Sequence, residues 1–322
     1  MKKENKLLKK ILSWNEVGTV IPLAILYIFC LVVNPSFFRI QNIMDVLRAS
    51  STSLIVAVPV TFLLSSGAMD LSVGSATSLG GVVCCICLMN DLPIPVSILL
   101  ALCAGGIVGF INGIVCVRHG MPPFIATLGM QYCINGLLTV ITKGIAITNW
   151  NNKSFQIIGQ GKIGGLVPYL VIYAGIVAII GSIVLSKTKY GRSVLAVGGN
   201  KETSFLAGID VEKIKISCNV LVSVFAAFAG VLIASRFANA QPAAGSGTEM
   251  TIMASCIIGG TSHKGGTASI LGTVLGCILL GSIQNALIVM GVSTFYMNLI
   301  YGLILLAALY IDKYRRKALG LQ

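Results

Sequence analysis

Two acidic residues lie beside long apolar stretches, where an ionised side chain is costly. Asp70 precedes Leu-Ser-Val-Gly, and Glu249 precedes Met-Thr-Ile-Met. A carboxylate pair in such places could carry protons or ions across a membrane, as in a secondary transporter driven by an ion gradient. Alternatively, each carboxylate could cap the backbone N–H groups in the first turn of a helix. We favour capping, because no Lys or Arg lies in the middle of an apolar stretch to pair with either acid.

A second group of residues places amides and hydroxyls inside apolar stretches. These side chains offer hydrogen-bond donors and acceptors without charge, which suits neutral, hydroxyl-rich solutes such as sugars. Hydrogen bonding between neighbouring helices is the alternative role for some of them. We predict that the group lines a translocation pathway, and its members are Asn112, Thr127, Gln131, Asn135, Gln284, Asn285 and Asn298.

The longest charged stretch of the chain, residues 186–215, separates two apolar stretches. A protein that only spans a membrane needs short polar turns between its helices, so this long island indicates a docking surface for a protein outside the membrane. The candidate docking residues are Gly191, Arg192, Gly198, Gly199, Asn200, Lys201, Glu202 and Gly208.

The sequence contains no pattern typical of an enzyme or a metal site. It has neither a G-x-x-x-x-G-K-[ST] phosphate loop nor an H-E-x-x-H motif. His119 and His263 fall in predicted turns, without a nucleophile or a metal partner nearby. The ten cysteines lie in or beside apolar stretches and are interpreted as small hydrophobic residues. We therefore predict no catalytic residue, no metal and no cofactor on this chain, so that energy for active transport must come from another chain.

The composition identifies the elements that position these residues as membrane helices. Of the 322 residues, 56% are hydrophobic and 10% are charged, whereas about a quarter are charged in a soluble domain. Because a membrane helix needs about 20 apolar residues, the sequence predicts an all-α polytopic membrane protein with about ten transmembrane helices. The predicted spans are 17–33, 51–66, 71–89, 93–117, 123–142, 166–185, 216–235, 250–261, 268–290 and 294–311.

The basic residues predict the orientation of the spans, because Lys and Arg collect in cytoplasmic loops. Both ends of the chain are basic, so segments 1–16 and 312–322 are predicted to be cytoplasmic, as is the island at 186–215. Segment 143–165 is then an external loop. The net charge of +13 is mostly an orientation signal. No basic face with aromatic platforms is present for binding nucleic acid.

A repeated spacing divides the single transmembrane domain, residues 1–322, into two halves. Glycine pairs follow Asp70 and Glu249 by ten and eleven residues, at Gly80-Gly81 and Gly259-Gly260. With five spans in each half, 17–142 and 166–311, the second half must enter the membrane upside down, which predicts an inverted 5+5 repeat. Glycines in the fourth and ninth spans would allow close helix packing at the seam between the halves.

Several segments, in this order, resemble the permease subunits of bacterial ABC importers, in the ribose-type simple-sugar branch. The resemblance covers residues 42–312 and rests on Asp70-Leu-Ser-Val-Gly-Ser, Pro122-Pro123-Phe-Ile-Ala-Thr-Leu-Gly129, Gly191-Arg192 through Gly198-Gly199-Asn200, Ala240-Gln241-Pro242 and Gly259-Gly260-Thr-Ser-His-Lys-Gly265-Gly266.

The resemblance implies a type II ABC importer-like fold in a bacterial cytoplasmic (inner) membrane. It also implies the partners: a second permease subunit in a homodimer or heterodimer, two copies or halves of a cytoplasmic ATPase that holds ATP and Mg, and an extracytoplasmic sugar-binding protein. The island would dock on the ATPase through a short coupling helix near residues 201–208. The chain would then form the pathway for a simple sugar, such as a ribose-like pentose, a hexose or a related furanose.

Two departures from the family pattern bear on the substrate. The chain has Glu249-Met250-Thr251 where the family typically has Glu-Leu-Asp, and Gln284-Asn285-Ala286 where the family often has Asn-Gly. Nucleosides and branched-chain amino acids, which related branches carry, therefore stay as alternative substrates.

Overall fold

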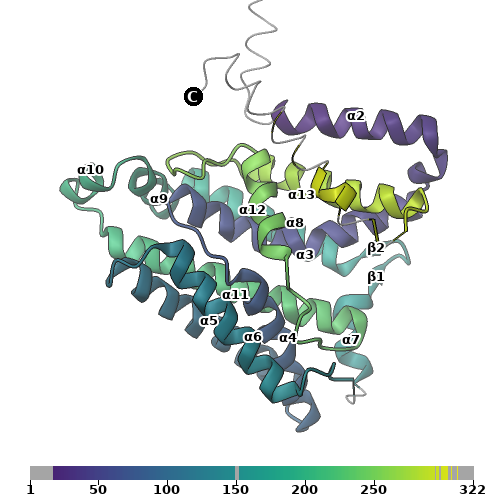
Figure 1. Cartoon of the computed structure of the whole chain (residues 1–322), viewed down its shortest axis with the longest axis horizontal. Helices are drawn as coiled ribbons and strands as arrows, with labels where there is room; N and C mark the ends of the chain where they lie inside the picture. Colours follow the sequence, from purple (N-terminus) through teal and green to yellow (C-terminus); the bar gives the residue numbers. More distant parts are fainter. Residues whose placement is uncertain are drawn as a thin grey trace, which may run out of the picture.

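The computed structural model describes residues 17–148 and 152–293, together with 295, 296, 299–303, 306 and 310. Figure 1 shows these residues as a bundle of helices that run at varied angles to one another. Segments 1–16 and 312–322 and the pathway candidate Asn298 lie outside the described residues. In chain order, the first elements are α2 (Val17–Val33), η1 (Pro35–Phe38), α3 (Ile40–Ser65), α4 (Val73–Met89), α5 (Ile94–Val117), α6 (Pro123–Thr142) and α7 (Lys153–Gln160). The remainder are β1 (Lys162–Ile163), β2 (Val167–Pro168), α8 (Tyr169–Lys187), α9 (Lys189–Gly199), α10 (Lys201–Leu206), α11 (Val211–Phe237), α12 (Thr248–Ile258) and α13 (Ile270–Val289).

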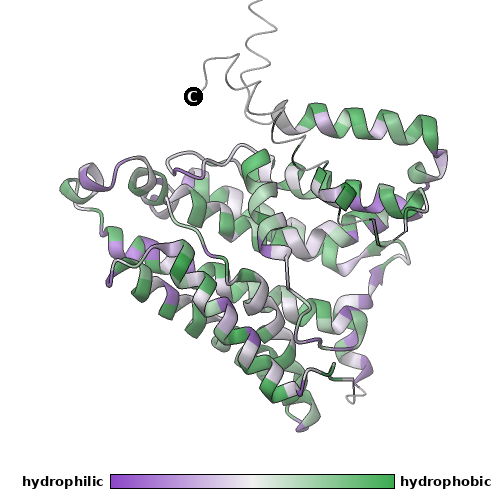
Figure 2. Ribbon diagram, viewed as in Figure 1, coloured by the Kyte–Doolittle hydropathy of each residue, from purple (hydrophilic) through white to green (hydrophobic). Residues whose placement is uncertain are grey.

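The lengths of these helices agree with a polytopic membrane protein. Within the described residues, six helices are long and apolar enough to cross a membrane: α3, α5, α6, α8, α11 and α13. The helices α2, α4 and α12 are apolar but shorter. Figure 2 shows apolar residues along most of the helical surface and polar residues gathered towards loops and helix ends. The expected number of about ten spans stays a prediction, because the last predicted span, 294–311, lies partly outside the described residues.

Several boundaries differ from the sequence prediction; α11, for example, begins at Val211 rather than at residue 216. Helix α3 begins at Ile40 rather than at residue 51, because Asp45 and Arg48 lie on the helix and not in a loop. Segment 143–165, which was predicted to be an external loop, contains α7. The strands β1 and β2 form a small antiparallel hairpin that the all-α prediction did not include. Helix α7 is tied to α11, because the Ser235 hydroxyl donates to the Phe155 carbonyl at 2.6 Å and accepts from the Gly159 N–H at 2.8 Å.

Helix packing joins the two halves of the chain reciprocally. The long helix α11 of the second half packs most extensively against α5 and α4 of the first half. The long helix α3 of the first half packs against α13 and α12 of the second half, and also against α8. In each half a non-helical segment follows the long helix, and a shorter helix, α4 or α12, comes next. The core therefore depends on contacts between residues far apart in the sequence.

Glycines make the contact between α5 and α11 possible. A methyl group added to Gly109 would overlap the carbonyl oxygen of Asn219 and lie 2.7 Å from the Val220 Cα. Gly105 meets the backbone of Ser223 in the same way, one turn earlier on α5. The prediction that small residues in the fourth span allow close helix approach is thus confirmed.

The glycines of the ninth predicted span play the same part on α13. A methyl group on Gly272 would overlap the backbone of Gly259, and one on Gly276 would overlap the backbone of Ser255. Gly281 lies against the side chain of Ser50 on α3. Gly272 and Gly276 thus pack α13 against α12 within the second half, and of these three glycines only Gly281 lies at a contact between the halves, which differs from the prediction that they pack at the seam.

We expect Gly109→Ala to destabilise the folded chain, because its methyl group must displace backbone rather than a flexible side chain. Such overpacking typically costs about 1–3 kcal/mol. The measurement is the midpoint of thermal unfolding of the purified chain in detergent. Gly175→Ala on α8 is the matched control, since no atom lies within 4 Å of the added methyl group. Equal midpoints for the two variants would contradict the packing argument.

Candidate functional site

Asp70 organises the chain between α3 and α4. Its side chain is only 2% exposed. The Oδ1 atom accepts hydrogen bonds from the Ser72 N–H at 2.7 Å and from the Ser72 hydroxyl at 2.6 Å. Since α4 begins at Val73, the carboxylate lies beside the free N–H groups and the positive dipole end of that helix. The carboxylate accepts from the Ser72 N–H, one residue before the helix, and not from the N–H groups of the first turn that the capping interpretation named.

Helices α5 and α6 contribute polar groups to the same place. The Asn112 amide on α5 donates to Asp70 Oδ2 at 3.2 Å and to the Ser72 hydroxyl at 2.8 Å. On α6, the Thr127 hydroxyl accepts from the Leu71 N–H at 3.0 Å and donates to the Pro123 carbonyl at 2.7 Å. Asp70, Ser72, Asn112 and Thr127 are all buried. They form one network around the start of α4.

Glu249 is the second buried acid, at the start of α12. It lies inside the first turn of that helix, whereas Asp70 lies before α4, and it is 8% exposed. Its Oε1 atom accepts from the Gln131 amide of α6 at 3.1 Å. Its Oε2 atom is buried and has no hydrogen-bond partner. Glu249 is therefore a buried carboxylate, and one of its oxygens remains free to accept a hydrogen bond.

The two helix starts lie directly against each other. A methyl group on Gly74 would overlap both Glu249 Oε2 and the Gly245 carbonyl oxygen. The N–H of Gly245 also donates to the Ser78 hydroxyl of α4 at 2.9 Å. We define Asp70, Ser72, Asn112, Thr127, Gln131 and Glu249 as the acid cluster. It combines two carboxylates with two helix N-termini inside the bundle, where both helix dipoles favour negative charge.

The structure does not bring every pathway candidate into the acid cluster. Asn135 is half-buried one turn after Gln131 on α6, so the two lie on the same side of that helix. Gln284 is exposed and Asn285 is half-buried on α13, whose main neighbours are α3 and α12. The Asn285 Oδ1 atom is buried without a partner. The pathway role of all these residues stays a prediction.

The charged island folds into two short helices whose ends are set by local capping. The Thr188 hydroxyl accepts from the Gly191 N–H at 3.2 Å, and Asn200 Oδ1 accepts from the Thr203 N–H at 2.9 Å. Asp210 caps α11 by accepting from the Lys213 N–H at 3.0 Å. This backbone hydrogen bond lowers the pKa of the Asp210 carboxyl below its usual value, and a hydrogen bond from the Lys213 side chain is the second largest cause of the lowering. Three capping residues therefore divide the island into α9, α10 and the start of α11.

The docking candidates separate into packed and exposed residues. Gly191 is buried, and a methyl group there would overlap the carbonyl oxygens of Val184 and Leu185. Gly198 is equally tight against the Ser65 carbonyl and the Gly266 N–H, which are hydrogen-bonded to each other at 2.8 Å. These two glycines hold α9 on the bundle. The exposed candidates are Arg192, Gly199, Asn200, Lys201, Glu202 and Gly208.

Two apolar residues on the island were missed by the sequence reasoning. Phe205 is 71% exposed and Leu206 is 85% exposed, both on α10. Figure 1 shows α10 at the left edge of the molecule, beyond the ends of the long helices. The sequence could have indicated these two residues, because the charged neighbours Lys201, Glu202 and Asp210 place them outside a lipid-facing stretch. Two exposed apolar side chains at a projecting tip suit a protein partner.

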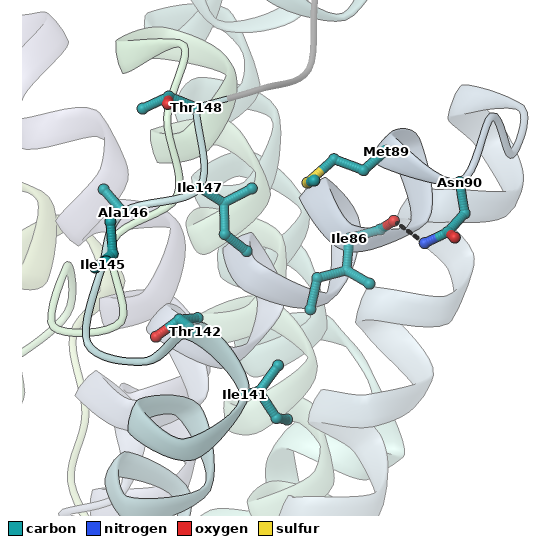
Figure 3. A pocket seen from close by; sticks show the side chains of 9 residues that line it. All are labelled: Ile86, Met89, Asn90, Ile141, Thr142, Ile145, Ala146, Ile147 and Thr148. Carbon is teal, nitrogen blue, oxygen red and sulfur yellow. Dashed lines mark hydrogen bonds between the residues drawn. The ribbon is translucent and has the colours of Figure 1, made fainter.

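A hollow at the other end of α4 and α6 is separate from the acid cluster. It has a volume of about 360 Å³ and lies between the end of α4 and segment 141–148 (Figure 3). Most of its lining is apolar, and the Asn90 amide is turned back onto the Ile86 carbonyl at 2.8 Å. Within the described residues, no group of three or more His, Cys, Asp or Glu could hold a metal ion.

Comparisons with known proteins agree over nearly the whole chain. The family model described as branched-chain amino acid transport system / permease component matches residues 42–309. The ribose import permease protein of Haemophilus influenzae is 34% identical over 302 residues, which cover 93% of each chain. The L-arabinose ABC transporter permease protein of Azospirillum brasilense is 35% identical over 303 residues, or 94% of this chain and 88% of the relative. The ribose import permease protein of Bacillus subtilis is 34% identical over 300 residues, 93% of each chain. No solved structure matches the chain.

Asp70→Ala is expected to lower the free energy of unfolding by about 2 kcal/mol or more, because buried donors on Ser72 and Asn112 lose their acceptor. Asp70→Asn should lose less, since it keeps one acceptor oxygen. Thermal unfolding in detergent measures both effects. Asp45→Ala, which removes an exposed carboxylate on α3, is the control. A loss for Asp70→Ala no larger than that for Asp45→Ala would contradict the proposed network.

Proposed function

Because the chain belongs to the family of branched-chain amino acid transport system permease components, we propose that it forms the translocation pathway for a simple sugar in an ATP-driven importer. The observation that carries this proposal is the full-length similarity to permeases named for ribose and for L-arabinose. A pentose or a related sugar is therefore the preferred cargo. Sequence identity of 33–35% does not by itself separate ribose from arabinose.

In this proposal the chain acts with three kinds of partner in a bacterial cytoplasmic membrane. A second permease subunit completes the pathway, two copies or halves of an ATPase bind ATP and Mg, and an extracytoplasmic protein delivers the sugar. This chain contributes no catalytic residue and binds no cofactor. Both of its termini and the island face the cytoplasm, in accordance with the distribution of Lys and Arg.

The exposed surface of α10 is the proposed ATPase contact. Phe205 and Leu206 supply apolar area, and Lys201 and Glu202 supply charges beside it. Movement of α10 would reach the membrane helices through α9, whose Gly198 lies against the end of α3 and the loop at residue 266. Because glycine packs tightly against backbone here, α9 has little freedom to shift relative to α3, so we propose that the island moves as a rigid body with these helices.

We further propose that the acid cluster belongs to the sugar pathway. Sugar hydroxyls donate hydrogen bonds well to carboxylates, and Glu249 Oε2 has no partner in this structure. The reciprocal packing of the two halves supports an inverted repeat of ten spans in total, in which α4 and α12 are the equivalent interrupted elements. Ion coupling by Asp70 is less favoured, because Ser72 and Asn112 already engage both of its oxygens.

The double variant Phe205→Ala with Leu206→Ala should weaken ATPase docking, because it removes two large apolar side chains from the contact. Burial of one such side chain is worth about 1.5–3 kcal/mol, so we expect docking to weaken by about tenfold or more. Co-purification of the ATPase and the transport-coupled ATP hydrolysis of the assembled importer are the measurements. Glu202→Lys should also impair coupling while leaving membrane insertion intact.

Ile25→Ala with Ile28→Ala, an exposed apolar pair on α2, serves as the control. If this pair and the α10 pair have equal effects on ATPase retention, then α10 is not the docking surface.

Glu249→Gln should raise the KM for sugar uptake by about tenfold, because hydrogen bonds to a charged acceptor contribute about 1.5–3 kcal/mol. The measurement is uptake of labelled ribose and labelled arabinose into vesicles that hold the assembled importer and ATP. Asp45→Asn is the control, because it neutralises an exposed carboxylate on α3 that is not a pathway candidate.

Unlabelled pentose should compete in this assay, and unlabelled leucine should not. Collapse of the proton gradient should leave uptake unchanged while ATP is present. Uptake that stops with the gradient would instead support ion coupling through Asp70 and Glu249, and competition by leucine would support an amino-acid cargo.

A further inference from the structure

An apolar hollow lies on the outer side of the helices α3, α8 and α11. It has a volume of about 390 Å³, and its lining is almost entirely hydrocarbon. Phe62 of α3, Ile180 and Val184 of α8, and Leu221 and Phe225 of α11 contribute to its walls. Gly181 lets α8 approach α3 closely, because a methyl group there would overlap the Val58 side chain. No residue of the acid cluster or of α10 lines this hollow.

One end of the hollow is polar. Tyr190 lines it, and the Tyr190 hydroxyl lies 2.8 Å from the Ser217 hydroxyl. The Tyr190 ring stacks on Phe62, with ring centroids 6.3 Å apart. Thr188 also lines this end, between Lys187 and Lys189. The hollow is therefore lined by polar residues at the end beside the charged island and by apolar residues along α8.

A second hollow continues around Tyr190. It has a volume of about 500 Å³, and it shares Tyr190 and Leu221 with the first. Arg118 and Lys213 are among its lining residues. Both have carboxylate partners, since Arg118 lies 3.5 Å from Glu212 and Lys213 lies 2.9 Å from Asp210.

Unpaired cations give this end a positive excess. Lys187 and Lys189 are exposed, and neither has an ion pair within the described part of the chain. The Arg192 guanidinium lies nearby, where it donates to the Lys187 carbonyl at 3.4 Å. With the two paired acids counted, cations still outnumber carboxylates around the junction of the two hollows.

We propose that the two hollows together bind one anionic phospholipid, with an acyl chain along α8 and the phosphate beside Lys187 and Lys189. Basic pockets between membrane helices on the cytoplasmic side are suited to anionic headgroups. One turn of a partner helix, about 10–12 Å across and 5.4 Å high, occupies about 420 Å³ or more, so a hollow of about 390 Å³ holds less than one turn. A flexible hydrocarbon chain fits both the shape and the apolar lining. The proposed cytoplasmic location of the island decides only which membrane leaflet supplies the lipid; the lipid site itself does not rest on it.

The test is native mass spectrometry of the full chain, purified in detergent and offered phosphatidylglycerol or phosphatidylcholine with the same acyl chains. The wild type should retain one phosphatidylglycerol in preference to phosphatidylcholine. Ile180→Trp should reduce retention of both lipids, because the indole fills the hollow. Ile179→Trp is the matched control, since Ile179 is as exposed on α8 and does not line the hollow.

The headgroup contact has its own pair of variants. Lys187→Gln with Lys189→Gln should lower phosphatidylglycerol retention by about fivefold or more, as expected for loss of surface cations, and leave phosphatidylcholine unchanged. Lys153→Gln with Lys162→Gln removes two exposed lysines at a distant place and should change neither lipid.

The proposal is overturned if the tryptophan variants retain lipid equally, or if the two lysine pairs behave alike. Should Ile180→Trp fail to fold, a phosphatidylglycerol with a photoreactive acyl chain decides the question on the wild type. Crosslinks to residues 177–184 support the site, and crosslinks spread evenly over α5, α6 and α8 overturn it. None of these measurements needs sugar or ATPase, so their failure is distinct from failure of the proposed transport function.

Discussion

Free backbone N–H groups at the starts of α4 and α12 constrain the interior of this protein. A helix leaves four N–H groups without intrahelical partners, and hydrocarbon offers none. The starts of both helices must therefore be enclosed by protein, and the structure encloses them against each other at Gly74 and Gly245. Asp70 accepts from the Ser72 N–H just before α4, and Glu249 lies in the first turn of α12. Helices α5 and α6 must then lie where Asn112, Thr127 and Gln131 can complete the hydrogen bonding.

Close glycine packing links this interior to the island. Gly109 brings α5 onto α11, and Gly198 brings α9 onto the end of α3 and the loop before α13. Because α3 and α13 come from different halves of the chain, the island contacts both halves. The proposed function uses this property, since ATP-driven movement at α10 must change the surroundings of the acid cluster. The side chains that could make that contact, Phe205 and Leu206, are both exposed on α10.

The candidate site was only partly predictable. Asn112, Thr127 and Gln131 stand out in the sequence, because an uncharged polar side chain in an apolar stretch needs a reason to be there. Their partners do not stand out, since the Asn112–Asp70 and Gln131–Glu249 hydrogen bonds join residues 42 and 118 positions apart. Gly191 and Gly198 were selected as docking residues, and the structure gives them a packing contact. Phe205 and Leu206 were not predicted as docking residues, because hydropathy alone does not distinguish a lipid-facing residue from one at a protein interface.

Local properties of the chain established its class and most of its helices. Long apolar stretches define membrane helices through the cost of an unpaired backbone, and the N-caps Asn200 and Asp210 set where α10 and α11 begin. The prediction failed where a boundary depends on distant contacts. Polar Asp45 and Arg48 belong to α3, and α7 is held by Ser235 of α11. The pairing of α4 with α12 and the exchange of helices between the halves are likewise decided by packing. Such contacts depend on the shapes of surfaces far apart in the sequence, which no run of neighbouring residues encodes.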